Sequence, residues 1–195
     1  MGQPVKYVWS HGTFREDEDG PTHEPVEQEA EIRLMEHLKN HHGGNSMLVL
    51  RPADAIETNI AWKLALENRT TPTALILSRQ NIKTLPATGT TRAAAAAMAA
   101  RGAYTVAESD GRPDVILVAS GSEVATLVEA ASLLMAEGIK TRIVSAPSEG
   151  LFRLQDEQYR NSVITPGIPV FCLTAGLPVT MLGFALSIVV GVLLG

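Results

Sequence analysis

The sequence predicts an α/β protein with parallel or mixed sheets flanked by helices. Short apolar stretches that contain β-branched residues alternate with helical patterns, and the same alternation resumes after an alanine-rich interruption. The order strand, helix, strand, helix, strand implies a parallel sheet with right-handed crossovers. At 195 residues the chain is long enough for two small domains.

The part of the chain before the interruption contains three predicted strands and two predicted helices. The strands are Val5–Ser10, Met47–Leu50 and Thr73–Leu77. The first helix begins at Pro25, and apolar residues recur at every fourth position, which predicts one buried face: Val26, Ala30, Leu34 and Leu38. The second helix opens with a capping-box pattern, Asp54 followed by Glu57, and continues across Ile60, Leu64 and Leu66.

The alanine-rich segment 82–102 predicts a linker between domains, because a polyalanine helix face packs little. Four further strands follow it: Ala103–Ala107, Val115–Ala119, Thr141–Ser145 and Val170–Leu173. A second capping box, Ser120 with Glu123, predicts a helix to about Gly138, and Ser148 caps a helix through Tyr159. The predicted organisation is therefore a domain over 1–81, the linker, a domain over 103–180 and an apolar tail over 181–195.

Composition excludes several classes of function. The net charge of −5 argues against a surface that coats nucleic acid. The single cysteine, Cys172, rules out an internal disulfide framework and a multi-cysteine metal site. It lies in an apolar strand, which predicts a buried side chain and not a nucleophile. One cysteine and a start, Met1–Tyr7, without signal-peptide features fit a cytoplasmic protein.

The polar loop between the first strand and the first helix is the densest group of candidate functional residues. It contains His11, Glu18, Asp19, Thr22 and His23. Ligands of open α/β sheets bind at the carboxyl ends of strands, and a helix N-terminus favours anions. Two histidines there can contact a phosphate or transfer protons near neutral pH. The alternative is a solvated loop with capping residues.

Arg79 directly follows a buried strand, where an arginine can bind a phosphate or carboxylate with two hydrogen bonds. A surface ion pair explains its position equally well.

No metal site is predicted. Glu16–Asp19 lacks the regular spacing of ligands for a divalent cation. The acidic residues after Pro25 are expected to form a solvated helix face: Glu27, Glu29, Glu31 and Glu36. Three histidines at the end of this helix are expected to stabilise its last carbonyls: His37, His41 and His42.

Five strings, in this order, resemble transketolase. They are Glu18-Asp-Gly-Pro-Thr-His23, Leu50-Arg-Pro-Ala-Asp54, Ala74-Leu-Ile-Leu-Ser-Arg-Gln-Asn81, Ser120-Gly-Ser-Glu-Val124 and Val144-Ser-Ala-Pro-Ser148. The resemblance covers roughly residues 5–179. It identifies the chain as the latter part of the pyrimidine-binding domain joined to part of the C-terminal domain.

The resemblance implies an enzyme that moves a two-carbon ketol unit between sugar phosphates in the pentose phosphate pathway. Such enzymes use thiamine diphosphate and Mg²⁺ or Ca²⁺, and act as homodimers. By motif, His11 and Arg79 match residues that bind the substrate phosphate, and Asp19 matches the acid that contacts a substrate hydroxyl. His23 matches a histidine that contacts the donor carbonyl and helps to transfer protons.

The departures from the family pattern concern the cofactor. The chain contains no counterpart of the Gly-Asp-Gly motif, the metal ligands or the activating glutamate, and His11-Gly12-Thr13 replaces the usual His-Asp-Ser. Because the protein must position and tune the cofactor, we expect no ketol transfer by the isolated chain. The alternative is a non-catalytic assembly or binding module, or a split-enzyme subunit that pairs with a separate cofactor-binding chain.

The tail after Arg160 carries no charged residue. Three interpretations remain open for Met181–Gly195: a truncated or frame-altered end, a segment packed on the second domain, or a membrane anchor. Pro178 and the absence of flanking cations argue against the anchor.

Overall fold

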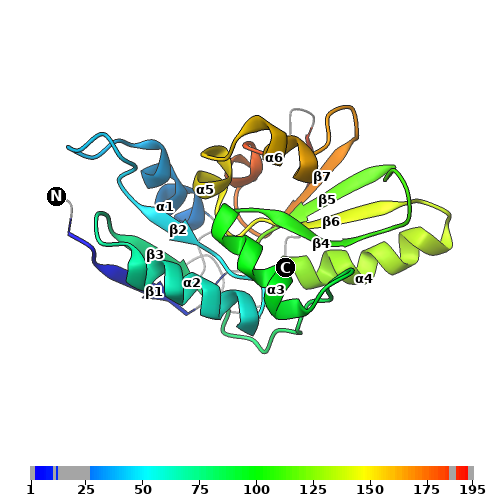
Figure 1. Ribbon diagram of the computed structural model, residues 1–195, viewed down its shortest axis with the longest axis horizontal. Coiled ribbons are helices and arrows are strands. Elements are labelled where there is room, and N and C mark those ends of the chain that lie inside the picture. Colours follow the sequence, from blue (N-terminus) through cyan, green and yellow to red (C-terminus); the bar gives the residue numbers. More distant parts are fainter. Residues whose placement is uncertain (1–2, 11, 13–26, 185–187, 193–195) are drawn as a thin grey trace.

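The computed structural model describes residues 3–10, 12, 27–184 and 188–192, the last range by its backbone alone. The first sheet has three parallel strands in the order β1-β3-β2 (Figure 1). Their bounds are Lys6–Trp9 for β1, Leu48–Leu50 for β2 and Thr73–Ile76 for β3. Helices α1 (Gln28–His37) and α2 (Ala55–Glu67) precede β2 and β3 along the chain. The central strand β3 is buried along its whole length.

The second sheet has five strands in the order β4-β6-β5-β7-β8. Only β4 runs antiparallel to its neighbour, so the sheet is mixed and the predicted α/β class is confirmed. The strand bounds are Tyr104–Glu108, Val115–Ala119, Thr141–Ser145, Val170–Thr174 and Ile188–Val192 for β4 to β8. The helices are α4 (Glu123–Ala136), α5 (Glu149–Arg153) and α6 (Glu157–Val163), with the short 3₁₀ helix η2 at Pro178–Met181.

The alanine-rich segment is helical and packed. It forms α3 (Arg92–Ala97) and the 3₁₀ helix η1 (Met98–Arg101). Ala96 is fully buried and Ala99 nearly so, and both helices contact α2. The expectation that this face packs little is therefore wrong, because small side chains allow close helix–helix approach. Gly102 ends η1 at φ +90°, and a Cβ at this position would overlap the backbone of Ser148 and Phe152.

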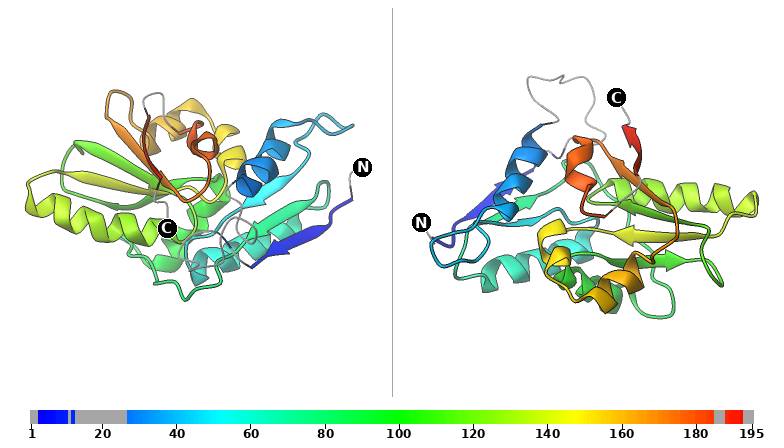
Figure 2. Two further views of the ribbon diagram at one scale, coloured as in Figure 1. Left: turned by 180° about the vertical axis from the view of Figure 1, so that it is seen from behind. Right: turned by 90° about the horizontal axis from the view of Figure 1, so that it is seen from above.

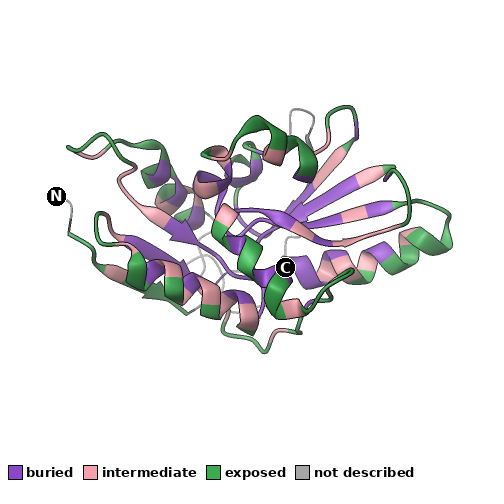
Figure 3. Ribbon diagram, in the orientation of Figure 1, coloured by how far each residue is buried: buried purple, intermediate pink, exposed green. Residues whose placement is uncertain are grey.

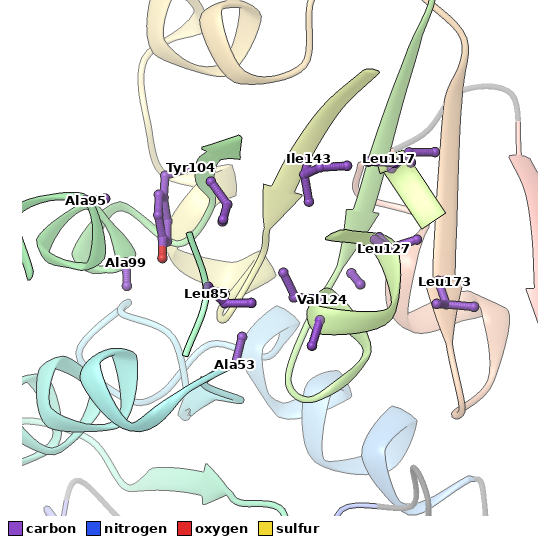
Figure 4. Packing of buried hydrophobic residues seen from close by; sticks show 14 residues of the cluster. Ala53, Leu85, Ala95, Ala99, Tyr104, Leu117, Val124, Leu127, Ile143 and Leu173 are labelled. Carbon is purple, nitrogen blue, oxygen red and sulfur yellow. The ribbon is translucent and has the colours of Figure 1, made fainter. Parts of the chain in front are cut away.

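The largest apolar core joins this segment to the second sheet. Its side chains come from both halves of the chain: Ala53 and Leu85 lie near Val124, and Ile143 and Leu117 lie farther along the second sheet (Figure 4). In this cluster Tyr104 and Val124 pack from β4 and α4. Burial is concentrated in the strands, whereas the outer faces of α2 and α4 are exposed (Figure 3).

Helix α2 begins as the capping pattern predicts. The Asp54 carboxylate accepts hydrogen bonds from the N–H groups of Ile56 and Glu57, at 3.0 and 2.8 Å. In a capping box the Glu57 side chain would accept from the N–H of Asp54. Here Glu57 Oε2 accepts instead from the N–H of the preceding residue, Ala53, at 2.9 Å.

Helix α1 buries a different face from the one predicted, although Ala30 of the predicted face is partly buried. Leu34 is 57% exposed and Leu38 is 48% exposed, and Val26 lies outside the described residues. The buried residues of α1 are Glu29, Arg33 and Glu36, so the prediction of a solvated acidic face is wrong for two of its four members. The physical reason is that these charges find partners in other elements, which the next subsection describes. Helix α1 lies beside η2 and α5 (Figure 2).

Two helix starts in the second half differ from the predictions. The Ser120–Glu123 pattern caps no helix, because α4 begins at Glu123 with Ser122 as its N-cap and no side-chain cap bond. Ser148 does cap a helix, accepting from Leu151 N–H, but that helix ends at Arg153. A second helix, α6, then begins with its own cap at Asp156.

Part of the apolar tail belongs to the second sheet. Strand β8 pairs in parallel with β7, with Val170 opposite Ile188, and Met181 and Phe184 are buried against the core. This supports the interpretation of the tail as a segment packed on the second domain. Within the described ranges, no helix combines the length and apolarity needed to cross a membrane.

Candidate functional site

The carboxyl edge of the first sheet brings the ends of its strands together. The N–H of Gly12 donates to the carbonyl of Leu77 at 2.9 Å, and the N–H of Leu77 donates to the carbonyl of Trp9 at 2.7 Å. A Cβ on Gly12 would lie 3.4 Å from Leu77 O and 3.9 Å from Arg51 Nε. The residues that follow β1, β2 and β3 therefore meet at this edge, where ligands of open α/β sheets bind.

Of the four residues predicted to carry function, the structure describes Arg79. It is exposed, three residues beyond the end of β3 and two beyond Leu77. His11, Asp19 and His23 lie outside the described residues. Their roles therefore stay predictions.

Arg51, which directly follows β2 at the same edge, was not among the predicted site residues. Its side chain is almost fully buried, at 2% exposure. Nη1 donates to the carbonyl of Ser120 at 2.8 Å and forms an ion pair with Glu123 Oε1, also at 2.8 Å. A charged residue directly after a buried strand was the signal that singled out Arg79, and it applies to Arg51 as well.

A glycine is required at position 121, because the Arg51 side chain extends from the first sheet to the second domain directly beside it. It adopts φ +61°, and a Cβ there would lie 2.9 Å from Arg51 Cζ. The backbone reinforces the contact, because Gly121 N–H donates to the carbonyl of Arg51 and Arg51 N–H donates to that of Pro147. Arg51 thus joins the two sheets through both its backbone and its side chain.

The buried charges of α1 complete a network around Arg51. Arg33 Nε donates to Glu29 Oε1 at 2.8 Å, and Glu29 Oε2 lies 3.6 Å from Arg51 Nε. Burial disfavours the Glu29 carboxylate, but the Arg51 and Arg33 guanidiniums outweigh it and lower its pKa. Ser120 Oγ accepts from Arg33 and Arg51, which explains why it is not a helix cap. Here α1, which follows the predicted substrate loop, is fixed to β2 and α4.

Glu36 has a different environment within this network. Its Oε1 accepts from the N–H of Val49 and from Ser148 Oγ, each at 3.2 Å. Its Oε2 has no hydrogen-bond partner among the described residues and lies 3.8 Å from Arg33 Nη1. Burial is the dominant effect and raises the pKa of Glu36.

The histidines at the end of α1 do not bind its last carbonyls as predicted. The carbonyl of Glu36 accepts instead from Arg153 Nη2, at 3.2 Å. The His37 ring lies 2.8 Å from Arg153 Nη1 and 3.4 Å from Glu149 Oε2. His41 and His42 lie exposed in the following turn. Arg153 replaces the histidines in this contact because its long side chain reaches the Glu36 carbonyl from α5.

A second buried network lies where α2 and α3 meet β4. Asp54 Oδ2 accepts from Arg92 Nε at 2.7 Å and from the N–H of Leu85 at 3.0 Å. Burial opposes ionisation of Asp54, but these hydrogen bonds, above all the one from Arg92, lower its pKa. Glu57 accepts from Tyr104 Oη and Arg92 Nη2, yet burial dominates and raises its pKa. This network joins the start of α2 to α3 and β4.

No metal centre is present in the described part of the chain, where no three His, Cys, Asp or Glu side chains are placed to hold an ion. Cys172 is buried, as predicted, and burial raises the pKa of its thiol to about 12. A thiol with that pKa is not an activated nucleophile.

Comparisons with known proteins identify both halves of the chain. Residues 1–84 match the family model for the transketolase pyrimidine-binding domain, and residues 102–192 match that for the transketolase-like C-terminal domain. The second match extends through β8, so the expectation that the resemblance ends near Val179 is wrong. The chain is an α/β protein built from parts of two such domains.

Curated and solved relatives agree. The chain is similar to the transketolase of Geobacillus stearothermophilus, with 44% identity over 86% of this chain and 24% of that protein. It is also similar to the crystal structure of Campylobacter jejuni transketolase, with a TM-score of 0.78 and 32% identity over 95% of this chain and 26% of that one. A structure titled as an inactive β4 tetramer of a split-gene transketolase shares the fold, with a TM-score of 0.61 and 24% identity over 87% of this chain and 47% of that one.

The chain therefore belongs to the transketolase family. It spans about a quarter of the length of the curated relatives that it matches.

Proposed function

We propose that this chain forms the substrate-binding side of a transketolase, which transfers a two-carbon ketol unit between sugar phosphates. The observation that carries the proposal is the match of both halves to transketolase domains. The meeting of Gly12 and Leu77 at the sheet edge supports it, because one residue follows His11 and the other closely precedes Arg79.

Each predicted residue has a role in the proposal. His11 and Arg79 bind the substrate phosphate, for which a guanidinium offers two parallel hydrogen bonds. Asp19 accepts a hydrogen bond from a substrate hydroxyl. His23 donates to the donor carbonyl oxygen as negative charge develops there and transfers a proton. Arg51 contacts no substrate in this proposal, and acts by holding the strand ends and α1 in place.

The family depends on thiamine diphosphate, whose thiazolium supplies the carbanion chemistry when bound. The described residues do not fit that group, because no three possible metal ligands converge among them, and the buried carboxylates of Glu123 and Asp54 are already paired with arginines. The proposal therefore assigns the cofactor and its Mg²⁺ or Ca²⁺ to a part of the enzyme outside these residues. The proposal also includes a cytoplasmic homodimer. Its domain boundaries are 1–81 for the first domain and 103–180 for the second, with a linker over 82–102 and an apolar tail over 181–195.

The second candidate is a split-enzyme subunit or a non-catalytic assembly module. The split-gene protein among the structural neighbours supports it, since it shows that transketolase domains can be carried on separate chains. An adjacent reading frame that encodes Gly-Asp-Gly and the missing glutamate favours the split enzyme. Its absence favours a non-catalytic product.

The test is a coupled ketol-transfer assay with thiamine diphosphate and Mg²⁺. The isolated chain is expected to give no turnover, and turnover above that of a His23→Ala variant contradicts this expectation. The chain is then mixed with a chain that comprises the preceding part of the Geobacillus relative, and turnover is expected. Persistent inactivity of a stable mixed complex contradicts the catalytic proposal and supports the assembly module.

Variants of the mixed complex assign the residues. His23→Ala is expected to lower kcat by about 100-fold or more, the range for a general acid–base group. Arg79→Ala is expected to raise KM by roughly 10- to 150-fold, the equivalent of one charged hydrogen bond. His41→Ala and Arg112→Ala are the matched controls outside the proposed site, and equal losses in them overturn the assignment.

A further inference from the structure

A cavity of about 620 Å³ lies beside the second sheet. It is bounded by the end of α6, by the segment 164–170 that leads into β7, and by residues 182–184 after η2. Small-molecule sites in proteins have volumes of about 300–1,000 Å³, so the cavity is large enough for a ligand. Its described lining falls within 152–184, far along the chain from every residue with a proposed role in ketol transfer.

The walls of the cavity are connections between strands of the second sheet. Phe152 of α5, Val163 of α6 and Met181 of η2 belong to one apolar cluster. Ile116 and Cys172 contribute to the same cluster from β5 and β7. Helix α4 packs in the other large cluster and lies across the sheet from α6 (Figure 1). The segments around the cavity therefore cover a single face of this sheet.

The interior of the cavity is apolar. Phe152 and Phe184 line it and stack on each other, with ring centroids 5.3 Å apart and an interplanar angle of 26°. Ile168 also lines it, and all three side chains are buried. Aromatic side chains bind other flat rings through face and edge contacts. The cavity therefore suits a ligand with a flat apolar body.

Arg160, near the end of α6, is the one charged residue among the described residues that line the cavity. Its guanidinium has no hydrogen-bond or ion-pair partner in the described part of the chain. Three other arginines of this half are paired with carboxylates: Arg101 with Asp156, Arg142 with Glu108 and Arg153 with Glu149. An unpaired guanidinium beside an apolar cavity favours a ligand carboxylate, which can accept two parallel hydrogen bonds from it.

A second cation lies at the edge of the same cavity. Gly167 lines the cavity, and a Cβ on it would lie 3.8 Å from Arg112 Nη2. Arg112 is exposed and, like Arg160, has no carboxylate partner within the described ranges. Two guanidiniums at one cavity attract an anion even in a chain with a net charge of −5.

We propose that this cavity binds a small carboxylate that carries a flat apolar body. The ligand carboxylate accepts hydrogen bonds from the Arg160 guanidinium, and the apolar body packs against the rings of Phe152 and Phe184. Arg112 adds to the attraction for the anion at the edge of the cavity. The proposal does not rest on ketol transfer, and its test needs no measurement of activity.

Isothermal titration calorimetry with the full chain tests the preference for a carboxylate. The probes are naphthoate and naphthamide, which have the same flat rings but differ in charge. Naphthoate is expected to bind roughly 10- to 150-fold more tightly than naphthamide, the equivalent of one charged hydrogen bond.

A variant without the guanidinium tests the role of Arg160. Arg160→Met is expected to raise the Kd of naphthoate by roughly 10- to 150-fold and to leave the Kd of naphthamide unchanged. Arg69→Met, at an exposed arginine in the first half of the chain, is the matched control and is expected to bind naphthoate as the wild type does. Circular dichroism confirms that both variants are folded.

Methyl NMR spectra of the isoleucine-labelled chain place the ligand. Naphthoate is expected to shift the δ1-methyl signals of Ile164 and Ile168, which line the cavity. The signal of Ile60, in α2, is expected to stay in place and serves as the control. This readout uses the wild-type chain, so it does not depend on the folding of any variant.

Four outcomes overturn the proposal. They are the absence of naphthoate binding at millimolar concentration, equal affinities for naphthoate and naphthamide, an Arg160→Met variant that binds naphthoate as tightly as the wild type, and methyl shifts at Ile60 in place of Ile164 and Ile168. Binding that prefers the carboxylate, needs Arg160 and shifts the two cavity methyl signals supports it.

Discussion

Replacement of Arg51 by methionine tests the network that joins the two sheets. The substitution keeps much of the side-chain volume but removes the guanidinium from Glu123, which is fully buried, and from Glu29. Loss of one partner of a buried ion pair costs about 3–5 kcal/mol, because the remaining charge is left without compensation. For a chain of this length that lowers Tm by roughly 6–20 °C.

The assay is urea unfolding at pH 7, followed by circular dichroism, with the m-value as a check on two-state behaviour. Arg51→Lys keeps the positive charge but not the several N–H donors of the guanidinium. Its free energy of unfolding is expected to lie between those of Arg51→Met and the wild type. Glu123→Gln removes the opposing charge while its Oε1 still accepts from the N–H of Ala175. In the double variant Arg51→Met/Glu123→Gln, the loss is expected to be smaller than the sum of the single losses by about 1–3 kcal/mol.

Two results would refute this reasoning. One is an Arg51→Met variant whose free energy of unfolding lies within about 1 kcal/mol of that of the wild type, because a loss this small is what a surface ion pair contributes. The other is additivity in the double variant, which would show that the two groups do not act on each other in the folded chain.

Three further predictions test the remaining buried groups. Burial raises the folded-state pKa of Glu36, so the stability that its protonated form contributes is present below the unfolded-state pKa and is lost as the pH rises through the folded-state pKa. Relative to the wild type, Glu36→Gln is therefore expected to gain free energy of unfolding as the pH rises above about 4.5, measured by urea titrations at several pH values. A stability difference that does not change with pH contradicts this expectation. Asp54→Ala removes a helix cap and leaves Arg92 without its closest carboxylate. The free energy of unfolding, measured by thermal unfolding, is expected to fall by about 3 kcal/mol or more. A fall of only about 1 kcal/mol would show that the cap alone matters. Gly102→Ala introduces a Cβ into the backbone of α5 and is expected to destabilise far more than Gly89→Ala, which has a positive φ but open space, so equal losses would rule out the steric explanation.

What the sequence predicted well depends on how far apart the interacting residues lie. The Asp54 cap was predictable, because the carboxylate and the N–H groups that it accepts from lie within three residues. The Ser120–Glu123 pattern looks the same in sequence, but Arg51, from a position 69 residues earlier, binds Ser120 instead. Local patterns carry no information about such a distant competitor.

The buried face of α1 differs from the predicted one for the same reason. Apolar spacing predicted that Leu34 faces the core and that Glu29 is solvated, whereas Leu34 is exposed and Glu29 is buried. Charges of opposite sign are buried together when each finds a partner, and the partner Arg51 comes from another strand. Strands β1 to β7 were predicted closely, because short apolar runs with β-branched residues mark strands irrespective of distant contacts, whereas no strand was predicted where β8 lies in the tail.

The crossing of Arg51 from one sheet to the other limits how this chain can be recombined with its relatives. A chimaera joined within 82–102 would take Arg51 from one parent and Gly121, Ser120 and Glu123 from the other. Segments from two parents fit only when both retain the arginine, the glycine and the glutamate, since any side chain at position 121 would meet the guanidinium. A junction at this point looks neutral in sequence, yet it separates residues that have to be inherited together.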